Sequence, residues 1–324
     1  MKSPVFSQLI VCAGLTFSAF SHAAVTLADA DSLWKFDGTG GTMANNQIID
    51  SSANAHVVNN NQNLFWTTVP ATGPYGGASV DPLARGLNFR PVLVTAVTGV
   101  GSSGGHVDND VVNAAGFSAS NATVTGSSTF VTRLKWDGAL TGFDDNVGNY
   151  WMVNNGMGGK NLGSMMGITA TGTLAYYTAA LASGDAGYVA AATYTYNSSI
   201  TLVKDVWYDI AMVVDDLGTI NDGTGRVTFY AVPATTGALL TSISGNNLWV
   251  TNTSNSGLTV GSESLGAAGN SNQRKTLNGT MDYLAMFDTA LTQNDVLGIF
   301  AVPEPSRGLL MLFGGMMLLS RRRR

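Results

Sequence analysis

The sequence predicts an all-β protein, a β-sandwich with one short helix near its C-terminal end. Three observations support this fold class. Short runs of β-branched and aromatic residues recur between clusters of Gly, Asn, Asp, Ser and Thr, which is typical of strands and turns. Proline is scarce, with eight residues in 324. No long segment has the period of a helix, so helices do not organise the core.

The clearest expected strand covers residues 130–136, where a largely apolar face alternates with a basic face. This alternation predicts a half-buried antiparallel strand. Phe130, Thr132, Leu134 and Trp136 lie on the first face, and Val131, Arg133 and Lys135 lie on the second. Residues 207–214 and 226–232 predict two more strands, joined by a loop of hairpin composition. Shorter candidates are 33–37, 86–90, 150–153, 174–178 and 258–261, whereas residues 91–128 show no pattern that we can assign.

A short helix is expected after Thr292. Thr292 and Asp295 form a variant of the capping box, with Asp in place of Glu or Gln. Val296, Leu297 and Phe300 then supply an apolar side.

The N-terminus has the three parts of a secretory signal peptide. Lys2 is followed by an apolar run over residues 9–20, and small residues then end at Ala23 and Ala24. We expect cleavage after one of these two alanines, so residues 1–23 form the signal peptide. The single cysteine of the chain, Cys12, lies in this segment, and the mature protein therefore has no disulfide.

The C-terminus carries a proline motif, an apolar segment and a basic end. The motif is Val302, Pro303, Glu304, Pro305 and Ser306; residues 308–320 are apolar, and the chain ends in Arg321, Arg322, Arg323 and Arg324. The prolines keep the motif extended, and the arginines resist translocation. Thirteen helical residues reach about 20 Å, short of the roughly 30 Å hydrocarbon core, and snorkelling with local thinning covers the difference.

This tail resembles the PEP-CTERM sorting signal, which has these three parts in this order. The resemblance implies recognition by an exosortase and cleavage near the two prolines. It also implies transfer of the ectodomain to the cell surface or extracellular matrix of a Gram-negative bacterium that makes exopolysaccharide. The membrane anchor, a short transmembrane helix at residues 308–320, would be transient. The expected organisation is a signal peptide at 1–23, one domain at 24–301 and the sorting signal at 302–324.

The domain itself resembles the LamG-like (concanavalin A-like) jelly-roll β-sandwich. Leu-Trp-Lys-Phe-Asp at 33–37, followed by Asp-Ser-Ser-Ala-Asn at 50–54, is similar to the opening of that family. Trp-Tyr-Asp-Ile-Ala at 207–211, leading to Val-Thr-Phe-Tyr at 227–230, looks like its central hairpin. Residues 277–282 and 287–292 look like its closing strand and helix. The resemblance implies one jelly roll over most of residues 32–300.

Charge and catalytic motifs exclude several functions. Residues 24–301 hold ten Lys and Arg against twenty Asp and Glu, a net charge near −10 that argues against nucleic acid or anionic lipid as a partner. Jelly-roll glucanases use paired glutamates, and this segment has only Glu263; an Asp pair could replace them in principle, but no clustered pair of Asp on a strand stands out. His56 and His106 lie in no recognisable motif, although a Ser–His–Asp arrangement stays open because triads assemble in space. We therefore expect a protein that is not an enzyme.

Two kinds of binding residue are candidates. Asp-rich loops could hold Ca²⁺, which takes six to eight oxygen ligands, although Asp also occupies turns for backbone reasons alone. These loop residues are Asp144, Asp145, Asn146, Asp215, Asp216 and Asp222. Aromatic rings stack on sugars, and Trp66 and Trp249, which have Thr and Asn residues close by in the sequence, are the platforms we favour over Trp151, Tyr176 and Tyr177. Trp34, Trp136 and Trp207 are assigned to the core.

Two functional hypotheses follow. The first is a non-catalytic module that binds cell-surface or matrix exopolysaccharide, with Ca²⁺ as a candidate stabilising ion. The second is a structural protein of the biofilm matrix with no discrete ligand site. A glycan-active enzyme is a distant third.

Overall fold

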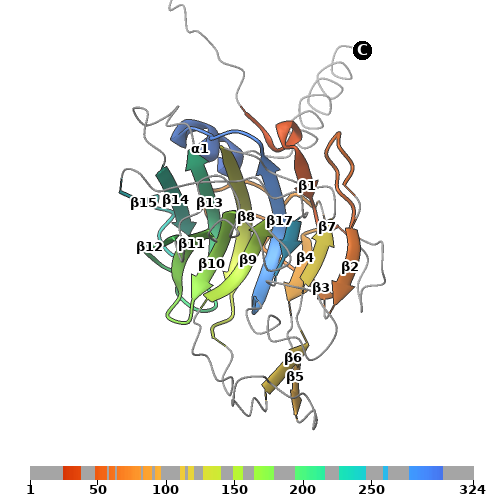
Figure 1. Ribbon diagram of the computed structural model, residues 1–324. Helices are drawn as coiled ribbons and strands as arrows, with labels where there is room; N and C mark the ends of the chain where they lie inside the picture. The colour runs from red at the N-terminus through yellow and green to blue at the C-terminus, as the bar shows by residue number, and fades with distance from the viewer. Residues whose placement is uncertain are drawn as a thin grey trace, which may run out of the picture.

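The computed structural model describes the central domain and leaves the two ends of the chain undescribed. The described residues are 25–37, 48–56, 58–62, 64–81, 83–89, 92–95, 110–113, 116–119, 127–139, 149–155, 164–178, 194–215, 226–245, 258–261 and 277–301. Two antiparallel sheets lie face to face, which confirms the predicted β-sandwich with a short C-terminal helix (Figure 1). The predicted signal peptide and sorting signal lie outside these residues. No helix in the described part of the chain is long and apolar enough to cross a membrane.

The first sheet runs through the middle of the described fold. Its strand order is β15 (Leu240–Ile243), β14 (Arg226–Pro233), β13 (Trp207–Asp215), β8 (Ser128–Trp136), β17 (Gly279–Phe287), β4 (Arg85–Phe89) and β3 (Leu64–Thr68), and β1 (Ser32–Trp34) also pairs with β17. Strands β13, β14 and β15 are consecutive in the chain, as are β3 and β4. The pairs that join them through β8 and β17 come from distant parts of the sequence, so the centre of the sheet depends on long-range pairing.

The second sheet covers one face of the first. Its order is β12 (Tyr194–Thr201), β11 (Thr173–Thr178), β10 (Ser164–Thr169), β9 (Asn149–Asn155), β16 (Leu258–Val260), β7 (Gly116–Ala119) and β2 (Val58–Gln62). A separate pair, β5 (Val92–Thr95) and β6 (Asp110–Asn113), projects from one end of the sandwich (Figure 1). A single 3₁₀ turn, η1 (Leu27–Asp29), precedes β1 among the described residues.

The main core lies between the sheets. Phe130 and Leu134 of β8 are fully buried there, as the alternation in the sequence predicts, and they share the core with Met166 and Tyr176 of the second sheet. Each such side chain contributes roughly 1.5–3 kcal/mol relative to an exposed one.

A second apolar cluster covers the outer face of the first sheet. Helix α1 (Gln293–Ala301) places Val296, Ile299 and Phe300 against residues such as Val131 and Ala285. Strands β8, β13 and β17 are therefore buried on both faces. This corrects the expectation that β8 is only half buried, because the helix and a loop cover its outer face.

The predicted cap of α1 is confirmed in its geometry. Thr292 Oγ1 accepts a hydrogen bond from the Asp295 N–H at 3.3 Å, and the Thr292 N–H donates to the Asp295 carboxylate at 3.1 Å. These two reciprocal bonds satisfy backbone donors that the first turn of a helix leaves unpaired.

The loop on the outer face, residues 69–81, connects β3 to β4 and is called the strap below. It folds on itself through a Ser79 N–H to Ala71 carbonyl bond of 2.9 Å and a bridge between Thr72 and Ala78. A Cβ atom at Gly77 would overlap the Phe300 carbonyl oxygen, so the strap lies directly against α1 at this point.

Candidate functional site

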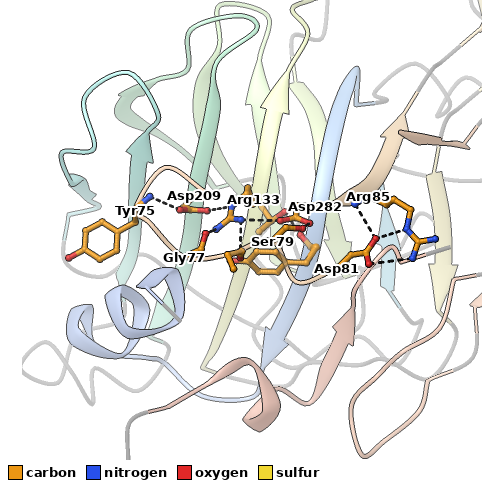
Figure 2. Close-up of polar contacts among 11 residues, drawn as sticks. Tyr75, Gly77, Ser79, Asp81, Arg85, Arg133, Asp209 and Asp282 are labelled. Carbon is orange, nitrogen blue, oxygen red and sulfur yellow. Dashed lines mark hydrogen bonds and ion pairs between the residues drawn. The ribbon is translucent and has the colours of Figure 1, made fainter. Parts of the chain in front are cut away.

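A buried charge network fastens the strap to the sheet. The Arg133 guanidinium on β8 donates to the Asp209 carboxylate on β13 at 2.7 Å and to the Asp282 carboxylate on β17 at 3.1 Å (Figure 2). All three residues are at most 1% exposed. One cation thus lies between two anions on three neighbouring strands.

The strap completes this network from above. Arg133 donates to the carbonyls of Gly77 and Ala78, both at 3.2 Å. The Tyr75 N–H donates to Asp209 at 3.0 Å, and the Ser79 hydroxyl donates to Asp282 at 2.8 Å (Figure 2). Burying charges is costly unless hydrogen bonds compensate, and here each charged group has several partners.

A β-bulge explains how Asp282 reaches the guanidinium. Met281 pairs with Leu134 and Tyr283 pairs with Arg133, so Asp282 is the extra residue between two registered pairs. In a bulge two successive residues oppose one on the partner strand, and Asp282 and Tyr283 both oppose Arg133. The Tyr283 ring centroid lies 5.9 Å from the guanidinium carbon.

Burial dominates the titration of the two acids. It raises the pKa of the Asp282 carboxyl to about 6, and Arg133 and Ser79 oppose this shift only in part. Burial likewise raises the pKa of Asp209 despite its contact with Arg133. Two carboxylates around one guanidinium leave an excess negative charge, and a proton on one acid removes it.

Next to the charge network, the same face of the first sheet contains a groove. It has a volume of about 530 Å³ and is lined by Phe65, Trp66, Thr67, Thr68, Asn88, Lys135, Asp137, Trp207, Asn278 and Thr280. Asp137 and Asn278 lie in the segments next to β8 and β17. The groove therefore combines aromatic, hydroxyl, amide and charged side chains.

Five groove residues form one continuous row across five strands. Trp207 pairs with Lys135, Lys135 with Thr280, Thr280 with Asn88, and Asn88 with Phe65. Residues paired in this way point to the same side of a sheet. The row has an aromatic ring at each end and polar side chains between them.

Hydrogen bonds and one ion pair hold the polar part of the row in place. Asn88 Nδ2 donates to Thr280 Oγ1 at 2.8 Å, and Lys135 Nζ lies 2.8 Å from Asp137 Oδ1. Asn278 Nδ2 donates to the Gly138 carbonyl at 3.1 Å. The groove is thus largely formed before any ligand enters, as binding sites usually are.

Of the two aromatic residues predicted to stack on sugars, the structure describes only Trp66. Trp66 lies on β3, packs in the main core and is 9% exposed, which corrects the prediction of an open stacking surface there, although part of Trp66 also lines the groove. Its neighbour Phe65 lies on the other face of the strand and is the more exposed of the two groove aromatics, because side chains alternate. Trp249 lies outside the described residues.

The prediction for Trp207 was also wrong, in the opposite direction. It was assigned to the core, and it is a partly exposed residue of the groove. Trp34 and Trp136 are buried as predicted, and Tyr176 is a core residue. The sequence analysis did not predict Asn88, Lys135 and Thr280 as groove residues. The signal that could have indicated them is the alternation of side chains, which places them on the face of each strand that points away from the core.

The calcium prediction can be placed for only one residue. Asp215 is the last residue of β13, is 1% exposed and pairs in register with Arg226. Asp144, Asp145, Asn146, Asp216 and Asp222 lie outside the described residues. Within the described ranges, no three acidic, histidine or cysteine side chains gather as a metal site. Calcium binding at these loops remains a prediction.

Ser32, His56 and Asp50 do meet in space, but not as a catalytic triad. Ser32 Oγ lies 2.8 Å and Asp50 Oδ2 lies 2.7 Å from the same ring nitrogen, His56 Nδ1. A triad needs the hydroxyl and the carboxylate on opposite ring nitrogens. Asp50 also accepts the N–H groups of Leu33, Ser52 and His56, which outweigh burial and lower its pKa. The cluster fastens this loop to β1.

Comparisons with known proteins identify no family. No family model matches the sequence, and no curated protein matches it. Solved structures with similar folds include the binding domain of botulinum neurotoxin serotype G, at 12% identity and a TM-score of 0.47, covering 84% of this chain and 50% of that one. This chain thus spans about half the length of the neurotoxin domain.

Two smaller proteins also match. The SAP-like pentraxin of Limulus polyphemus has 17% identity and a TM-score of 0.33, covering 56% of this chain and 75% of that one. The CBM40 of a Ruminococcus gnavus sialidase, bound to α2,3-sialyllactose, has 13% identity and a TM-score of 0.38, covering 58% and 93%. At such low scores these likenesses support no conclusion about function, and the β-sandwich rests on the strand pairing of this chain.

Proposed function

We propose that this protein is an exported, non-catalytic module that binds exopolysaccharide at the cell surface or in the extracellular matrix. The observation that carries the proposal is the row from Trp207 to Phe65 on the groove floor. Aromatic rings stack on the apolar faces of sugars, and amide, hydroxyl and ammonium groups bond sugar hydroxyls.

The dimensions of the row suit a chain of sugars rather than a single one. Strands lie about 4.8 Å apart, so five neighbouring strands span about 19 Å from first to last. Trp207 and Phe65, at the two ends, can each stack on a different sugar unit. The polar residues between them face the units in the middle.

The export part of the proposal rests on the two ends of the sequence. A signal peptide at 1–23 and a PEP-CTERM-like tail at 302–324 would deliver the domain through an exosortase to a Gram-negative cell surface. Mass spectrometry of protein from the producing cell tests this. We expect both ends to be removed, and finding intact full-length chains in the cytosol contradicts it.

Binding is tested by pull-down of the full-length chain in detergent on the producing cell's extracellular polysaccharide, with and without Ca²⁺. Trp207→Ala should weaken retention about tenfold, because it removes stacking area from the row. The matched control is Tyr75→Ala, which removes an exposed aromatic of the strap outside the groove and should leave retention unchanged. Equal retention of both variants contradicts the groove as the binding site.

One observation favours the alternative, a structural matrix protein. Threonine hydroxyls form a chain from the β10–β11 turn to β12: Thr169 and Thr171 lie 2.9 Å apart, Thr171 and Thr173 lie 3.5 Å apart, and Thr173 and Thr201 lie 3.4 Å apart. Such a polar surface suits solvated packing without a discrete ligand. Absence of polysaccharide retention by the wild-type protein would favour this alternative.

A further inference from the structure

We infer that the groove accepts an uncharged glycan chain and that Asp137 excludes acidic sugars from it. This inference rests on the proposed function and names its ligand class. The lining residues that the structure describes include two charged groups, Lys135 and Asp137, which neutralise each other. A carboxylate-bearing ligand therefore finds no unpaired cation among the described residues that line the groove.

The two side chains of the ion pair are partly exposed, although Asp137 Oδ1, the atom that faces Lys135, is itself buried. The Lys135 side chain is 28% exposed and the Asp137 side chain is 25% exposed. Lys135 is itself a member of the row, between Trp207 and Thr280, and Asp137 lies two residues further along the chain and lines the same groove. A bound chain that follows the row must pass over this pair.

The backbone fixes Asp137 in this position. The Asp137 N–H donates to the Asn278 carbonyl at 3.0 Å, and Asn278 Nδ2 donates back to Gly138. Gly138 has a φ of +97°, a conformation that residues with a Cβ rarely adopt, so the turn depends on this glycine. The Asp137 carboxylate therefore remains at the groove instead of turning away with a mobile loop.

Neutral and acidic sugars meet this pair differently. A sugar hydroxyl donates to the Asp137 carboxylate and accepts from the Lys135 ammonium, so both charges keep a partner. A sugar carboxylate accepts from Lys135 but is repelled by Asp137 at the same point. The net charge of residues 24–301, near −10, adds repulsion of the same sign.

The test uses the neutral and acidic fractions of the producing cell's extracellular polysaccharide, separated by anion exchange. Binding of the full-length chain in detergent is measured on each immobilised fraction. We expect retention on the neutral fraction only. Asp137→Asn, which keeps the side-chain shape, should gain about tenfold on the acidic fraction, because local repulsion is removed.

Asp205→Asn is the matched control. It makes the same change of net charge at an exposed residue that does not line the groove, and Asn tolerates its φ of +63°. A gain on the acidic fraction with Asp137→Asn but not with Asp205→Asn supports the inference. Equal gains, or no gain, refute the role of Asp137.

The two proposals fail in different ways. If the wild-type protein is retained on the acidic fraction alone, the inferred ligand class is wrong. If Trp207→Ala then abolishes this retention, glycan binding in the groove is still supported. Absence of retention on both fractions overturns the proposed function together with this inference.

Discussion

The buried acid pair predicts an unusual pH dependence, which we develop for Asp282. Its pKa is raised to about 6 in the folded protein, mainly by burial, against about 3.9 in an unfolded chain. Between these values the folded protein binds more protons than the unfolded one. The free energy of unfolding should therefore increase as the pH falls from 7 towards 4, and this stabilisation is absent above the folded pKa.

The magnitude follows from the size of the shift. About two pH units at 1.36 kcal/mol each give roughly 3 kcal/mol between pH 7 and pH 4 for Asp282 taken alone, and Asp209, whose pKa is also raised, titrates together with it. Groups whose pKa is lowered, such as Asp50 and Asp81, act in the opposite direction. Their stabilisation is lost mainly below pH 4. The pH range in which they act is therefore largely separate from the range between pH 7 and pH 4 in which Asp282 acts.

Asp282→Asn isolates the effect, because an amide mimics the protonated carboxyl. Its oxygen can accept from Arg133 and its nitrogen can donate to the Ser79 hydroxyl. We expect the variant to be at least as stable as wild type at pH 7.5 and to lose most of the slope between pH 7 and 4. Urea unfolding of the full-length chain in detergent, followed by tryptophan fluorescence, measures both.

The control is Asp81→Asn, which removes a carboxylate paired with Arg85 at 2.6 Å. Its pKa is lowered, so this change should destabilise the protein at neutral pH, the opposite sign to Asp282→Asn. An Asp282→Asn variant that is markedly destabilised at pH 7.5, or that keeps the wild-type slope, would refute the reasoning.

Three further predictions concern the cap, the strap and calcium. Thr292→Ala should lower the free energy of unfolding by about 1 kcal/mol in a urea titration, and no change would mean that the cap is dispensable. Gly73→Ala places a methyl group into the buried guanidinium and should cost about 1–3 kcal/mol in the same assay, whereas Gly245→Ala, with open space around it, should stay within about 0.5 kcal/mol. If the Asp-rich loops bind Ca²⁺, the melting temperature in calcium should exceed that in chelator, and equal temperatures would remove the calcium prediction.

Local patterns in the sequence were sufficient for the central strands and the helix. The alternation over 130–136 predicts β8 because every second residue enters the core, and Thr292 with Asp295 predicts the start of α1. These features depend on neighbours within a few positions. For the same reason β6 and β7, in the stretch 91–128, were not predicted, since their residues show no clear alternation.

The alternation of residues could not predict which segments cover each face of the sheet. A period of two tells which residues share a face but not what lies above it, and so Arg133 was placed on an open face. The strap and α1 that bury it come from distant parts of the chain. Trp66 and Trp207 were misplaced for a related reason, because large aromatics occur in cores and at binding surfaces alike.

The bulge at Asp282 is also invisible to alternation, because one extra residue moves the following positions to the other face. The groove itself needs the register of five strands from separate regions of the sequence. Its residues could be named only once that register was known.

The charge network and the groove row occupy successive outward positions on the same strands. On β13, Asp209 lies two residues from Trp207, and on β8, Arg133 lies two residues from Lys135. On β17, Asp282 lies two residues from Thr280. The residues that fasten the strap and the residues that line the groove are thereby separated along each of these strands. Substitutions in the groove row can change the groove lining without touching the charge network that holds the strap. If the groove binds a glycan as we propose, its ligand can change while the sheet keeps its shape.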